Sequence, residues 1–140
     1  MNSKNLKNYL NRLGLHPNRM TYYLHAITHP SYTEINSKFI SYERLEFLGN
    51  YLTNKIISEY LYNSSDNLND IINIYNNSIK EGTLAQAAKK IELGQLIVSN
   101  NVKISNRILC DCFEALVAAI YLDQNNENFI RKLIVENLFN

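Results

Sequence analysis

Acidic side chains recur at helical spacing in two otherwise apolar stretches of this sequence. Glu43, Glu46 and Asn50 follow one another at intervals of three and four residues, so they share one face of a helix. Asp111 and Glu114 are three residues apart and share a face of a second helix. Carboxylates among apolar residues are costly unless their charge is compensated, and a divalent cation between the two helices would compensate it. Acids at this spacing are more often a solvated helix face, so the pattern alone leaves both interpretations open.

The elements that must position these side chains are helices, and the sequence predicts an all-α fold. Strict alternation of polar and apolar residues, the mark of strands, is absent. We expect the first acids on a long helix that continues to about residue 61, and the second acids on a helix from about 108 to 123. The small residues Ala115, Ala118 and Ala119 favour close packing of this second helix.

Shorter helices are expected around these two, with breaks at turn-forming residues. We expect Gly14 and Pro17 to end an N-terminal helix, Asn18 to cap the next one, and Pro30 to break it. The remaining expectations are a polar loop at 33–38, a loop at 63–67, a helix from 68 to about 75, a helix from Gly82 to Gly94, a loop at 99–106, and a last helix from about 129 to 138.

Composition limits the class of protein. A chain of 140 residues, 46% of them hydrophobic, has the size and content of one globular domain. It has no apolar run long enough to span a membrane, and residues 1–6 lack the apolar core of a secretory signal. We therefore expect an intracellular protein, in the cytoplasm or in an organellar matrix or stroma, that is not secreted and has no membrane partner.

Net charge and cysteine content place fewer limits on the function than size and hydrophobic content do. The net charge of +1 argues neither for nor against a nucleic-acid partner. Cys110 and Cys112 are the two cysteines, too few for a zinc site without nearby histidines, and we interpret them as buried or half-buried thiols in a reducing compartment.

Four motifs resemble those of the ribonuclease III family. The family pattern E-R-L-E-F-L-G-D is matched at 43–50, with Asn50 in place of the final Asp, and I-L-A-D-x-x-E-A-L-I-G-A-I-Y-L-D is matched at 108–123. The pattern A-L-T-H-x-S-Y is matched at 26–32, and T-L-A-x-x-A-x-x-x-x-L-G at 83–94. Four motifs in the family's order, spread over most of the chain, leave little room for an unrelated helical bundle with coincidental matches.

The resemblance implies a metal-dependent endoribonuclease for double-stranded RNA. It implies one ribonuclease III-type endonuclease domain over residues 1–140, with no second, RNA-binding domain, acting as a homodimer on structured RNA such as rRNA precursors. It implies Glu43, Glu46, Asp111 and Glu114 as catalytic residues. Mg²⁺, or Mn²⁺, would bind at the positions of Glu46, Asn50, Asp111 and Glu114. Phe47 matches an aromatic residue that inserts into the partner subunit; the resemblance assigns no particular residue to RNA binding.

Two departures from the family pattern leave a second function open. Asn50 is neutral where the family has Asp, which should weaken metal binding by about 1–3 kcal/mol, or roughly 5- to 150-fold. Residues 69–80 offer Asn where many relatives carry Arg near the RNA backbone, which would weaken phosphate attraction. The alternative is therefore a catalytically impaired or inactive family member that serves as an RNA-binding or structural subunit of a ribonucleoprotein.

Overall fold

The computed structural model describes residues 3–140, and over these residues the fold is all-α, as predicted. Thr28 and Val98 form an isolated parallel bridge without a sheet. The helices, in chain order, are α1 (Ser3–Arg12), α2 (Met20–Ala26), α3 (Pro30–Ile35), α4 (Glu43–Tyr62), α5 (Leu68–Ser78), α6 (Glu81–Lys90), the 3₁₀ helix η1 (Leu93–Leu96), α7 (Asn106–Gln124) and α8 (Glu127–Phe139).

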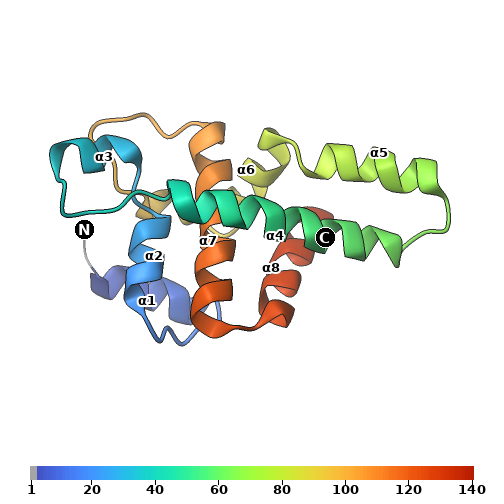
Figure 1. Cartoon of the computed structure of the whole chain (residues 1–140), viewed down its shortest axis with the longest axis horizontal. Coiled ribbons are helices and arrows are strands. Elements are labelled where there is room, and N and C mark those ends of the chain that lie inside the picture. The colour runs from blue at the N-terminus through green and yellow to red at the C-terminus, as the bar shows by residue number, and fades with distance from the viewer. Residues whose placement is uncertain (1–2) are drawn as a thin grey trace.

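Helix α7 is the centre of the molecule, and α4 crosses it (Figure 1). From Cys112 to Ile120 every residue of α7 is buried, so this helix is covered on all its faces. Helices α2, α6 and α8 pack around it, and α5 runs back beside the second half of α4 (Figure 1). The two helices that carry the predicted acids are therefore the two that form the core crossing.

Gly49 allows α4 and α7 to touch through their backbones. A Cβ atom at this position would lie 1.7 Å from the carbonyl oxygen of Glu114 and 2.4 Å from its carbonyl carbon. No side chain fits in that space, so glycine is required for the contact. The contact fixes the neighbouring Asn50 opposite Glu114.

The start of α2 differs from the prediction, because Asn18 does not cap it. The N-cap is Arg19, whose side chain makes no capping bond. The Asp123 carboxylate accepts hydrogen bonds from the backbone N–H groups of Asn18 at 3.0 Å and Arg19 at 2.7 Å, and from the Tyr23 hydroxyl at 2.6 Å. A carboxylate at the end of α7 thus caps the first turn of α2. The two segments are about a hundred positions apart, so local sequence does not reveal the contact.

The segment after Pro30 also differs, because a loop was expected from 33 and a helix extends through Ile35. Pro30 does break α2, and it then starts α3 as the first helical residue, where its fixed φ fits and its missing N–H costs nothing. The His29 ring nitrogen accepts a hydrogen bond from the Ser31 N–H at 3.0 Å and caps the new helix. The same proline therefore ends one helix and begins another.

Helix α6 ends before the predicted Gly94. Its last residue is Lys90, and Glu92 turns the chain in the left-handed region, at φ 57°. Gly94 lies in η1 instead. The other predicted loops and helices agree with the structure to within three residues at each end, and within residues 3–140 no helix is long and apolar enough to cross a membrane.

Candidate functional site

A small acidic pocket of about 220 Å³ lies where α4 and α7 cross, beside the start of α6. We call it the acidic pocket. Its lining residues are Glu46, Asn50, Ile79, Glu81, Leu84, Arg107, Cys110, Asp111 and Glu114.

Glu114 is the most buried acid of the pocket, with 2% of its surface exposed. The Asn50 Nδ2 donates a hydrogen bond of 2.7 Å to Oε2 of Glu114, and the Cys110 Sγ lies 3.7 Å from Oε1 as a weak donor. Burial raises the pKa of Glu114 to about 7, although the hydrogen bond from Asn50 opposes the rise. These hydrogen bonds hold the Glu114 carboxylate in place, but they only partly offset the cost of burying its negative charge.

Asp111 and Glu46 add further negative charge to the same pocket. Burial and the neighbouring Glu46 carboxylate together raise the pKa of Asp111 to about 6. The Arg107 Nε lies 3.4 Å from Asp111 Oδ1, and its Nη1 lies 3.8 Å from Glu81 Oε1. The positive charge of Arg107 lowers the pKa of Asp111, but not enough to cancel the increase.

The donors of the acidic pocket fit a hard divalent cation. Four carboxylates line the pocket, those of Glu46, Glu81, Asp111 and Glu114, and carboxylate oxygens are the ligands that Mg²⁺ and Mn²⁺ prefer. Burial is the main cause of the raised pKa values of Asp111 and Glu114, and a bound cation would favour the ionised form of both groups. Oxygen atoms of both lie within 4.8 Å of each other and of the Cys110 Sγ, a spacing that one ion can bridge.

Asn50 fits the cation less well than the carboxylates. Its amide nitrogen, not its oxygen, faces Glu114, and its Oδ1 accepts a 3.5 Å hydrogen bond from Asn54 Nδ2. Asn50 Oδ1 could join a metal only after the amide rotates, which would break both hydrogen bonds.

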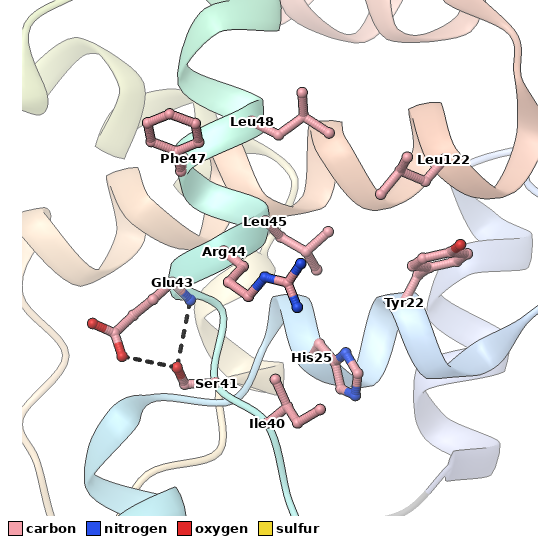
Figure 2. Close-up of a pocket in the computed structure, with 10 residues that line it drawn as sticks. All are labelled: Tyr22, His25, Ile40, Ser41, Glu43, Arg44, Leu45, Phe47, Leu48 and Leu122. Carbon is pink, nitrogen blue, oxygen red and sulfur yellow. Dashed lines mark hydrogen bonds between the residues drawn. The ribbon is translucent and has the colours of Figure 1, made fainter.

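Of the five residues predicted for catalysis and metal binding, the structure brings four together and leaves one apart. Glu46, Asn50, Asp111 and Glu114 all line the acidic pocket. Glu43 does not; it stands at the start of α4, where its carboxylate accepts a 3.0 Å hydrogen bond from the Ser41 hydroxyl (Figure 2).

Sequence reasoning missed three residues of the acidic pocket that could bind an ion or carry charge, besides the apolar Ile79 and Leu84. Arg107 and Cys110 each precede a predicted acid by four residues, so helical spacing alone could have found them. Glu81 comes from α6, and no local pattern in the sequence connects it with the other acids.

A second, apolar pocket of about 620 Å³ lies beside the first half of α4, and we call it the apolar pocket. Phe47 stands at its edge with 66% of its surface exposed (Figure 2). The remaining lining residues are Tyr22, His25, Ile40, Ser41, Glu43, Arg44, Leu45, Leu48 and Leu122.

The same fold occurs in solved nuclease domains. The structure superposes on the nuclease domain of ribonuclease III from Campylobacter jejuni with a TM-score of 0.82, at 26% identity, covering 98% of each chain. Another structure of that domain, concerned with flexibility in a region involved in dimer formation, gives 0.81 over 96% of this chain and 98% of that chain.

The sequence comparisons agree with the fold. The family model described as Ribonuclease-III-like matches residues 20–139, so the chain belongs to the ribonuclease III family, as its motifs indicated. Ribonuclease 3 of Mycoplasmoides gallisepticum is 39% identical over 97% of this chain and 21% of the relative. Ribonuclease 3 of Spiroplasma citri is 35% identical over 84% of this chain and 50% of the relative, so the chain spans half or less of the length of these two relatives.

Proposed function

We propose that this domain is a divalent-metal-dependent endoribonuclease that cleaves double-stranded RNA within cells. The observation that carries the proposal is the convergence of Glu46, Asp111 and Glu114 on one pocket at the α4–α7 crossing. Membership of the ribonuclease III family, with relatives named Ribonuclease 3, supports this reaction over other metal-dependent hydrolysis. Structured precursors such as those of rRNA are the substrates we expect.

The chain's own residues would bind and orient the reacting groups. Asp111 and Glu114 would hold Mg²⁺ or Mn²⁺ from α7, and Glu46 would approach it from α4. The bound ion would supply a water of lowered pKa and positive charge opposite the phosphate oxygens. Glu43, which lies outside the acidic pocket, would then contribute to its negative field rather than to direct metal binding.

We also propose that the domain acts as a homodimer joined at the apolar pockets. A phenylalanine 66% exposed beside a large apolar pocket is unfavourable in water, and burial against a second copy would remove it from solvent. Phe47 of each copy would enter the apolar pocket of the other, in an interface that uses the same surface twice. Duplex recognition by such a dimer would depend on A-form shape and backbone rather than sequence.

Asn50→Asp tests the proposed reaction directly. It adds the missing carboxylate, so we expect roughly 5- to 150-fold tighter Mg²⁺ binding and faster cleavage of duplex RNA, measured beside the unaltered protein in Mg²⁺ and in Mn²⁺. Asn67→Asp is the matched control, because it adds the same charge at an exposed position and preserves the N-cap of α5. Absence of cleavage by both Asn50→Asp and the unaltered protein would contradict a nuclease function.

One observation favours the alternative function, a catalytically impaired subunit of a ribonucleoprotein. The amide of Asn50 occupies Oε2 of Glu114, an oxygen that a metal would need. This alternative predicts no metal uptake by the unaltered protein and co-purification with a large ribonucleoprotein. A free dimer that binds Mn²⁺ would exclude it.

A further inference from the structure

Arg107 is the only Lys or Arg among the residues that line the acidic pocket, within the described chain of residues 3–140. Its guanidinium reaches two acids on different helices, Asp111 on α7 and Glu81 at the start of α6. Its side chain is nevertheless 73% exposed, and the two contacts are long, at 3.4 and 3.8 Å. Exposed ion pairs of this kind stabilise a fold by about 0–1 kcal/mol, so structural need does not explain the position of Arg107.

The place of Arg107 conflicts with metal binding. A divalent ion held by Asp111 would bring a second positive charge to the carboxylate that the guanidinium already contacts. Repulsion between the bound cation and the guanidinium would weaken the contact that Arg107 makes with Asp111 Oδ1. The guanidinium is on an exposed side chain and is free to turn outward, toward the mouth of the acidic pocket.

A phosphate group bound at the mouth of the acidic pocket would accept hydrogen bonds from the displaced guanidinium of Arg107. Two parallel N–H groups of arginine match two phosphate oxygens, and the charge-assisted bonds are strong. The nearby helix α5 (Leu68–Ser78) contains no Lys or Arg, and Lys80, which follows it, is not among the residues that line the acidic pocket. We propose that Arg107 occupies the acidic pocket in the metal-free protein and moves to a backbone phosphate of the RNA when a divalent ion takes Asp111.

This inference rests on the proposed function, but its test requires no cleavage. Arg107→Gln removes the charge at an exposed position, and Arg12→Gln removes the same charge from the exposed end of α1 as a matched control. Arg107→Lys keeps the charge. Circular dichroism of each variant would verify that the fold is retained.

Metal and RNA binding are expected to change in opposite directions in Arg107→Gln. Mn²⁺ affinity without RNA, measured by titration calorimetry, should rise by about two- to fivefold because a competing cation is lost. Affinity for a short RNA duplex in Ca²⁺, measured by fluorescence anisotropy with the RNA verified intact, should fall. The slope of log affinity against log salt should become shallower by about 1 for each protomer that contacts the duplex. Arg107→Lys should keep most of the slope, and Arg12→Gln should match the unaltered protein in both measurements.

Three results would overturn the proposal. A salt slope of Arg107→Gln equal to that of Arg12→Gln would exclude the phosphate contact. A Mn²⁺ affinity that is unchanged or lower in Arg107→Gln would exclude the exchange at Asp111. Absence of RNA binding by the unaltered protein would exclude the phosphate contact. None of these depends on whether Asn50→Asp cleaves RNA, so failure of the inference and failure of the nuclease proposal remain distinguishable.

Discussion

The acidic pocket and the apolar pocket lie on different faces of the same helix, α4. Each contains side chains in an energetically unfavourable environment, and the cause differs between the two. In the acidic pocket, buried carboxylates lie close together with too little positive charge, and the pKa values of Asp111 and Glu114 rise. In the apolar pocket, Phe47 is exposed to water beside a largely apolar lining. Each environment indicates the kind of partner that would stabilise it. The acidic pocket favours a bound cation, and the apolar pocket favours an apolar protein surface.

Gly49→Ala tests whether both pockets depend on the one helix crossing. The added methyl group would meet the backbone of Glu114 and force α4 and α7 apart, so we expect a loss of about 3–5 kcal/mol in the free energy of unfolding, measured with urea. Gly82→Ala is the matched control, because nothing lies within 4 Å of a Cβ there and the variant should gain up to about 1 kcal/mol. Equal stability of the two variants would show that the crossing tolerates separation.

Phe47→Ala tests the apolar pocket alone. We expect about 10- to 100-fold weaker dimerisation in analytical ultracentrifugation, because a buried aromatic anchor would be lost from the interface. Monomer stability should change by less than about 1 kcal/mol, since the ring is exposed in the isolated domain. Tyr62→Ala removes another highly exposed aromatic at the far end of α4 and should leave association unchanged; a dimer that survives Phe47→Ala would place the interface elsewhere.

Glu114→Gln tests the acidic pocket alone, through the pH dependence of stability. The pKa of Glu114 is raised in the folded protein from 4.5 to about 7, so the folded state binds the proton more tightly than the unfolded state does. Stability of the metal-free protein should therefore fall as pH rises from about 4.5 to 7, by about 1–2 kcal/mol.

Urea unfolding in the presence of EDTA at pH 5 and pH 8 measures this difference. Glu114→Gln should lose most of it and be the more stable protein at pH 8, while Glu136→Gln, at an exposed position, should behave as the unaltered protein does. Stability of the unaltered metal-free protein that rises toward pH 8 by the same amount would contradict the charge deficit in the acidic pocket.

Local sequence was sufficient for the parts of this protein that depend on periodic spacing. The acids on α4 and α7 share faces because of helical spacing, and the pattern located both helices to within a few residues. Pro30 was recognised as a break but not as the start of α3, because one residue type has both effects and the capping contact from His29 decides between them.

Contacts between distant segments could not be predicted. The cap of α2 comes from Asp123, the acidic pocket receives Glu81 from α6, and the spacing of the two helices depends on what Gly49 meets in α7. Each depends on the packed arrangement of helices, which no single segment encodes. Helical spacing also has a limit, since Glu43 shares a helical face with Glu46 but does not line the acidic pocket.

The backbone contact at Gly49 has a consequence for redesign of this domain. Because α4 and α7 meet through main-chain atoms, the distance between their donor positions is independent of which side chains stand there. We therefore expect exchange among carboxylate, amide, imidazole and thiol at positions 46, 50 and 111 to leave the spacing of the two helices unchanged. The domain offers a fixed frame in which preference among metal ions can be varied by side-chain chemistry alone.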